Sequence, residues 1–241
     1  MSIRITHLYG DLLNLYGSEG NIRALVRRLQ DAGETVEVRE VSLDSAEDIS
    51  GSSLVYLGPG TEKRTILALD DLRARSSQLL ECMAYGGTVL CSGSSSYLFG
   101  ETVKDLSGTV HEGLGFCSYN TVFDEKRRYG EYIMKTLVSQ FPVVGVINTS
   151  ATLDWKDDPF FSVEYATDPI IGDTEGVLTA SLMLTELQGP LLWRNPGLLD
   201  YVAGKAAGHE LGYNDADWYR SAVEGYDSVL SVLTKKSGKE T

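Results

Sequence analysis

A cluster of small residues in the middle of the chain has the composition of a catalytic turn. Residues 88–100 read TVLCSGSSSYLFG, an apolar run that stops at Gly93 and is followed by three serines. This order is typical of a buried strand, a tight turn and a short helix, where an α/β sheet usually presents its nucleophile. Gly93 has the sharpest position in the turn, and it carries no reactive atom.

A thiol and several hydroxyls lie close to this turn in the sequence. The thiol belongs to Cys91, and the hydroxyls belong to Ser92, Ser94, Ser95 and Ser96. A base for either kind of nucleophile is not evident, because the three histidines are far apart. His111 could approach the turn, although a lone loop histidine is more often solvated, and no Gly-x-Ser-x-Gly motif is in the needed frame.

A second glycine-containing turn precedes this one. The apolar run 53–57 suits a strand that is buried on both faces, and it ends in Gly58-Pro59-Gly60. Because this turn has little side chain, its backbone N–H groups could face a ligand. The same glycines also suit a strand-to-helix turn for backbone reasons alone.

Alternating strands and helices must position both turns. Strands are predicted at 3–9, 35–41 and 53–57, and helices at 22–33 and within 66–85, so the first hundred residues indicate an open parallel sheet. Further strands are expected at 108–122, 129–136, 143–149, 161–165 and 177–184, with a more antiparallel character. Two helices, 196–207 and 216–234, end the chain. We expect one domain over residues 1–241.

The composition excludes several classes of function. The 241 residues contain 34 Asp and Glu against 21 Lys and Arg, a net charge of −13, which argues against nucleic acid or an anionic membrane as the main partner. Three cysteines without paired spacing predict reduced thiols. We expect no metal, no cofactor and no membrane insertion, and a cytoplasmic location.

Several segments, in this order, resemble the class I glutamine amidotransferase superfamily. They are LNLYGSEGNIRAL (13–25), LGPGTEKR (57–64), YLFG (97–100), EGLGF (112–116), RRYG (127–130), VGVIN (144–148) and EGVLTASLMLTELQGPLL (175–192). The chain is most similar to the cobyric-acid-synthase-like (CobB/CobQ-like) branch, and within it to GatD-type glutaminase subunits of lipid II isoglutaminyl synthase. The resemblance implies a three-layer, flavodoxin-like α/β fold with a mostly parallel central sheet and an antiparallel extension.

The resemblance also implies a catalytic pair, and this chain departs from it. In the family, a cysteine at the turn attacks the side-chain amide of glutamine and releases ammonia through a thioester, with a histidine after the last strand as base. The matching positions here are Gly93 and Gln188. Neither residue can take the corresponding role. A shift of two residues in the alignment would instead make Cys91 the nucleophile.

Other site positions follow from the same resemblance. The turn that stabilises the oxyanion matches Gly58 and Gly60, together with Ser94 and Ser95, which replace the family's glycines after the cysteine. The candidate substrate-pocket residues are Arg127, Tyr97 and Asn148. Arg127 lies between two other basic residues, so a solvated charge explains it equally well.

Three functions remain open at this point. We favour a non-catalytic homologue that acts as a scaffold or regulatory partner of a Mur-ligase-like synthetase in cell-wall precursor amidation. The alternative is an active glutaminase subunit that uses Cys91 to supply ammonia for peptidoglycan or cobyric-acid-type amidation. A third hypothesis is a module that binds a small anionic metabolite at the turn 94–96.

Overall fold

A six-stranded sheet forms the centre of the computed structural model, which describes residues 2–238. Its strands are β1 (Ile3–Leu8), β2 (Val36–Val41), β3 (Leu54–Leu57), β4 (Thr88–Ser92), β11 (Val177–Leu178) and β12 (Leu182–Thr185). They lie in the order β11-β12-β4-β3-β1-β2, in which the edge strand β11 is antiparallel to β12 and the remaining neighbours are parallel. The predicted parallel sheet is therefore confirmed.

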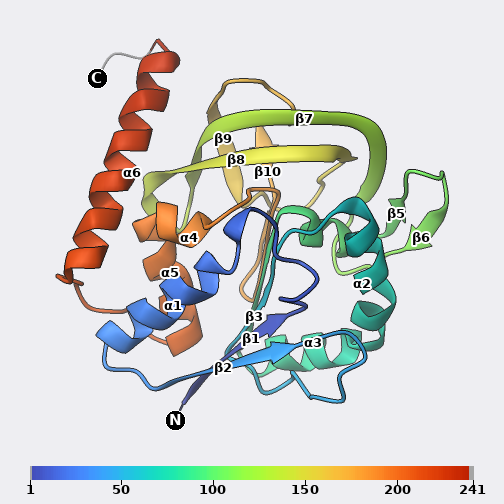
Figure 1. Cartoon of the computed structure of the whole chain (residues 1–241), viewed down its shortest axis with the longest axis horizontal. Helices are drawn as coiled ribbons and strands as arrows, with labels where there is room; N and C mark the ends of the chain where they lie inside the picture. The colour runs from blue at the N-terminus through green and yellow to red at the C-terminus, as the bar shows by residue number, and fades with distance from the viewer. Residues whose placement is uncertain (1, 239–241) are drawn as a thin grey trace.

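Helices cover both faces of this sheet, so the fold has the three layers expected from the resemblance (Figure 1). The helices are α1 (Gly20–Asp31), α2 (Glu62–Ala74), α3 (Ser76–Ala84), α4 (Leu191–Arg194), α5 (Pro196–Ala207) and α6 (Asp217–Lys236). Alternate residues of β3 point to opposite faces: Val55 and Leu57 pack in a core with α2 and α3, whereas Leu54 and Tyr56 pack in a core with α1 and α5. This two-sided burial explains why β3 is apolar throughout.

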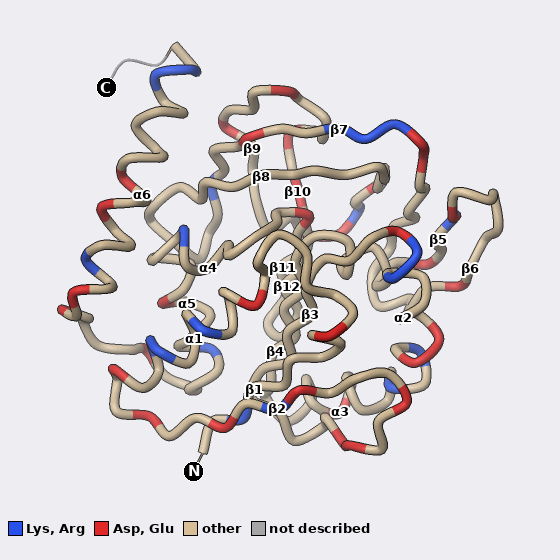
Figure 2. Tube along the Cα trace, in the orientation of Figure 1, with Lys and Arg blue, Asp and Glu red and all other residues tan. Residues whose placement is uncertain are grey.

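A second sheet makes the antiparallel extension. Its strands are β5 (Thr102–Lys104), β6 (Val110–Glu112), β7 (Asn120–Thr136), β8 (Ser139–Leu153), β9 (Phe161–Ala166) and β10 (Thr174–Glu175), in the order β10-β9-β7-β5-β6 with β8 paired to β7. The long hairpin of β7 and β8 passes over the end of the central sheet (Figure 1). Its segment 124–127 is exposed and overlaps the basic run drawn in blue on β7 (Figure 2).

Four predicted strands differ from those observed. The predicted strands 129–136 and 143–149 are parts of β7 and β8, which have 17 and 15 residues, because the polar exposed stretch before Arg128 hides the continuation of β7. The predicted strand 108–122 is wrong, since only β6 and the start of β7 fall within it. The predicted strand 177–184 is two antiparallel strands, joined by a turn in which Thr179 N–H donates to Leu182 O (2.9 Å).

Neighbouring parallel strands end at one edge of the central sheet, and this edge assembles the site. The loops that follow β3, β4 and β12 lead away from adjacent carboxyl ends. Residues near 59, 93 and 188 therefore meet, although they are far apart in sequence. No helix within residues 2–238 is long and apolar enough to cross a membrane.

Candidate functional site

The turn after β4 has the geometry of an elbow. Gly93 adopts a φ of +62°, in the left-handed region that residues with a Cβ rarely occupy. It begins η2 (Gly93–Leu98), a 3-10 helix whose residues are all buried. The change from an extended Ser92 to a left-handed Gly93 turns the chain sharply at the end of the strand, as a nucleophile elbow requires.

Gly93 and Gln188 lie against each other at this elbow. A Cβ placed on Gly93 would lie 3.0 Å from Gln188 Cγ and 2.7 Å from Pro59 Cβ. The second distance is shorter than Cβ contacts in folded proteins, so Pro59 occupies part of the space that a side chain at position 93 would need. The structure thus brings together the two positions that the resemblance assigned to nucleophile and base, with no side chain on the first.

Gln188 is fixed by hydrogen bonds to β8. Its backbone N–H donates to Val146 O (3.0 Å), and its side-chain amide donates to Asn148 O (3.1 Å). The residue is only 4% exposed, and its Oε1 is buried without a hydrogen-bond donor. A carboxamide does not take up a proton near neutral pH, so this side chain cannot act as a general base.

The glycine turn after β3 is occupied by the elbow serines. Gly60 N–H donates to Ser94 Oγ (2.8 Å), so this N–H is not free for an oxyanion. Gly58 packs closely on Leu13 O and has no space for a side chain. Ser95 donates to Leu57 O (2.9 Å), and Ser96 donates to Gly93 O (2.7 Å). These hydroxyls stabilise the turn from within.

Cys91 lies within β4 rather than at the turn. Its side chain is fully buried in the core beneath α2 and α3, and burial raises the pKa of the thiol well above its ordinary value. A buried, protonated thiol is a poor nucleophile. The candidate nucleophile Cys91 is therefore a core-packing residue in this structure.

The histidines all pair with carboxylates on other elements. His7 Nδ1 lies 3.0 Å from Glu40, His111 Nε2 lies 2.7 Å from Asp105, and His209 Nε2 lies 2.9 Å from Glu34. Among the described residues, no histidine forms a hydrogen bond with the elbow or with Cys91. The described chain also contains no group of three His, Cys, Asp or Glu side chains that could hold a metal ion.

A small cavity of about 20 Å³ opens beside the elbow, between Gly60, Ser94, Gln188 and Arg127. This volume holds about one water molecule. Arg127 forms an ion pair with Glu62 and donates to Asn148 O (3.2 Å). Ser150 donates to the same Glu62 carboxylate (2.5 Å). Although partial burial raises the pKa of Glu62, these contacts hold it below its usual value, so the ion pair stays charged.

Tyr97 connects the elbow to a buried acidic pair that the sequence analysis missed. Its hydroxyl donates to Glu186 (3.2 Å) and lies 2.6 Å from Thr149 Oγ1. Burial raises the pKa of Glu186 to about 7, and burial together with the Glu186 charge raises the pKa of Glu175 to about 8. Glu175 accepts hydrogen bonds from Thr185 Oγ1 (2.8 Å) and from Glu186 N–H (2.5 Å).

This acidic pair carries a proton at neutral pH. Burial disfavours charge on both carboxylates, and the charge of Arg128 only partly offsets this for Glu186, so at least one stays protonated. The sequence could have revealed the pair, because Glu175 precedes the apolar strand β11 and Glu186 follows the apolar strand β12, which pairs with it.

Comparisons with known proteins agree with this architecture. A model of the CobB/CobQ-like glutamine amidotransferase domain matches residues 4–183. The chain is 28% identical over 235 residues to "Lipid II isoglutaminyl synthase (glutamine-hydrolyzing) subunit GatD" of Streptococcus pneumoniae (strain ATCC BAA-255 / R6), covering 95% of this chain and 87% of the relative. The subunit of the same name from Staphylococcus aureus (strain N315) is 27% identical over 208 residues, covering 85% of this chain and 84% of the relative.

A solved structure supports the same fold. A crystal structure of a glutamine amidotransferase superposes with a TM-score of 0.50 at 14% identity, covering 84% of this chain and 98% of that chain. At this level of identity the likeness concerns the fold alone.

Proposed function

The chain belongs to the CobB/CobQ-like glutamine amidotransferase family, and we propose that it has lost glutamine hydrolysis. It would then act as a scaffold or regulatory partner of a Mur-ligase-like synthetase in the amidation of cell-wall precursors. The observation that carries this proposal is the contact of Gly93 with Gln188 at the elbow. The reaction of the family needs a thiol and an imidazole at these two positions.

The chemistry explains why the substitution of both positions matters. Formation of a thioester requires a sulfur atom that attacks the amide carbon and a base that takes the thiol proton and returns it to the leaving ammonia. Gly93 supplies no attacking atom, and the amide of Gln188 accepts no proton near neutral pH. Removal of either partner of such a pair costs several orders of magnitude in rate.

The surroundings of the elbow support the same proposal. Pro59 lies where a side chain at position 93 would begin, and the N–H of Gly60 is bonded to Ser94. The ion pair of Arg127 with Glu62 closes the adjacent cavity to about 20 Å³. A glutamine molecule needs far more space than one water molecule, so the cavity beside Gly60 and Ser94 does not admit it.

The proposed role as a partner rests on the relatives. Both GatD proteins are named as subunits of lipid II isoglutaminyl synthase, and the chain matches most of the length of each. A chain that retains this framework without its reactive groups keeps the means to bind a second subunit. We therefore expect a complex with a Mur-ligase-like synthetase in which ammonia comes from another source.

The experiment is an amidation assay with the purified chain and a Mur-ligase-like synthetase from the same organism. We expect the complex to use ammonium chloride as the nitrogen donor, to release no glutamate from glutamine, and to lose activity when the chain is omitted. Glutamate release that disappears in Cys91→Ala, but not in the matched buried variant Cys82→Ala, would establish the active-glutaminase alternative and refute the proposal.

A further inference from the structure

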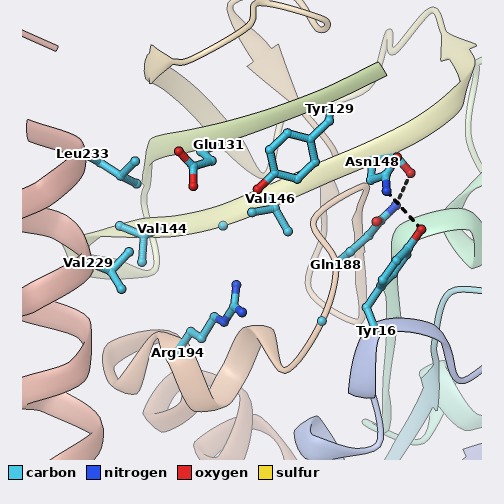
Figure 3. Close-up of a pocket in the computed structure, with 12 residues that line it drawn as sticks. Tyr16, Tyr129, Glu131, Val144, Val146, Asn148, Gln188, Arg194, Val229 and Leu233 are labelled. Carbon is cyan, nitrogen blue, oxygen red and sulfur yellow. Dashed lines mark hydrogen bonds between the residues drawn. The ribbon is translucent and has the colours of Figure 1, made fainter. Parts of the chain in front are cut away.

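A cavity of about 450 Å³ lies between β8, α4, α6 and the loop that carries Gln188 (Figure 3). Val144 and Val146 of β8 line one wall, and Val229 and Leu233 of α6 line another. The volume falls within the range of sites for small organic molecules. Gln188, at the position of the family's base, lines this cavity, whereas Gly93 and Cys91 do not.

Arg194 places an unpaired positive charge in this cavity. Its side chain rises from the end of α4 towards β8 (Figure 3). Arg194 is exposed, and in the part of the chain that the structure describes its guanidinium has no ion pair and no hydrogen bond, although its backbone N–H donates to Pro190 O. The Glu131 carboxylate on the opposite wall is already paired with Lys236 (2.7 Å). Arg194 is therefore free to bind an anionic group of a ligand.

Gln188 provides an unused acceptor at the other end of the cavity. Its amide N–H₂ donates to Asn148 O (3.1 Å), which fixes the orientation, since a flipped amide would bring two carbonyl oxygens together. The remaining Oε1 is buried without a donor, and Asn148 Oδ1 beside it is also buried without a donor. Buried acceptors of this kind cost free energy unless a donor reaches them.

We propose that this cavity binds a small monocarboxylate that also carries an amide or amine N–H and an apolar body. Arg194 binds the carboxylate, Gln188 Oε1 accepts the N–H with a small movement of the wall, and the valines of β8 and α6 pack on the body. Arg194 is the one free cation among the described residues that line this cavity, and with Glu131 opposite it favours a ligand with a single negative charge over one with two.

The test uses N-acetyl-L-leucine, which has these three features, in an ¹⁵N NMR titration of the whole chain. We expect saturable binding with a Kd on the order of 1 mM or tighter, and shifts at the amides of Val144, Val146 and Gly189. The methyl ester of the probe, which lacks the charge, should bind about tenfold more weakly or worse. The N-methylated probe, which lacks the N–H, should also bind more weakly.

Two arginine variants locate the anionic contact. Arg194→Met should weaken binding of the probe by about tenfold, because it removes a charge-assisted hydrogen bond while keeping the apolar stem. Arg23→Met, an exposed arginine on α1, should leave the Kd unchanged. L-Glutamine, which has no apolar body, should not displace the probe at equal concentration. Absence of saturable binding, or equal affinity of wild type and Arg194→Met, would overturn the proposal.

Discussion

Replacement of Gly93 by alanine tests whether the elbow has closed over the missing nucleophile. Two costs are expected. A Cβ at a φ of +62° costs about 1–2 kcal/mol of stability. Contacts of 2.7 Å with Pro59 Cβ and 3.0 Å with Gln188 Cγ add about 1–3 kcal/mol, because the core cannot accept an extra methyl group without shifting. The total is about 2–5 kcal/mol.

Gly86 offers a matched control for the backbone cost alone. It precedes the same strand, has a φ of +89°, and has no atom within 4 Å of an added Cβ. Gly86→Ala should therefore lose only about 1–2 kcal/mol. The difference between Gly93→Ala and Gly86→Ala isolates the crowding by Pro59 and Gln188.

The assay is urea-induced unfolding of both variants and wild type, followed by circular dichroism. The free energies of unfolding are compared, provided that the three m-values agree. A third variant, Gln188→Ala, removes the Cγ that Gly93→Ala would meet, so the double variant should regain about 0.5–1 kcal/mol relative to the sum of the single changes. If Gly93→Ala is no less stable than Gly86→Ala, the elbow has room for a nucleophile, and the argument from closure is refuted.

The remaining predictions concern other parts of the molecule. All three cysteine thiols are buried, so Ellman's reagent should label none of them quickly in the folded chain and all of them in urea; rapid labelling of one would contradict this. Because burial raises the pKa of Glu175 from 4.5 to about 8, the folded chain holds a proton that the unfolded chain releases. Stability should then fall between pH 5 and 8 by about 1 kcal/mol per unit, as measured by unfolding at each pH, and Glu175→Gln should flatten this slope. Arg28 is buried and donates to the partly exposed Asp200 (2.6 Å), so Arg28→Met should cost about 2–4 kcal/mol in urea, whereas the exposed Arg23→Met should cost less than about 0.5 kcal/mol; equal losses would show that the pair of Arg28 with Asp200 does not stabilise the fold.

The buried acidic pair also has a consequence for the elbow. Tyr97 joins Glu186 to the elbow helix η2, and burial keeps the pKa of its phenol well above the ordinary value, so it acts as a donor. Deprotonation of both glutamates would place two negative charges behind η2. We therefore expect the elbow to loosen at high pH before the rest of the fold does, which amide hydrogen exchange at Tyr97 would detect.

Local patterns were sufficient for much of the fold. Burial on two faces selects the apolar run of β3, and burial on one face selects the amphipathic spacing of α1. A sharp turn selects the small residues after β4. The long strands β7 and β8 were not predictable in this way. An exposed polar stretch interrupts the apolar pattern of β7, and pairing with β8 on both sides of an irregularity between Phe123 and Arg128 keeps the chain extended.

For the site, the sequence alone determined which chemical groups exist, and only the tertiary structure decided which of them meet. The residue types at Gly93 and Gln188 exclude a thiol and an imidazole there, whatever the fold. Their contact with each other and with Pro59, the burial of Cys91, and the cavity beside Arg194 depend on elements far apart in the chain. Short-range preferences carry no information on such contacts, because these arise only when parallel strands align their ends and helices pack across them.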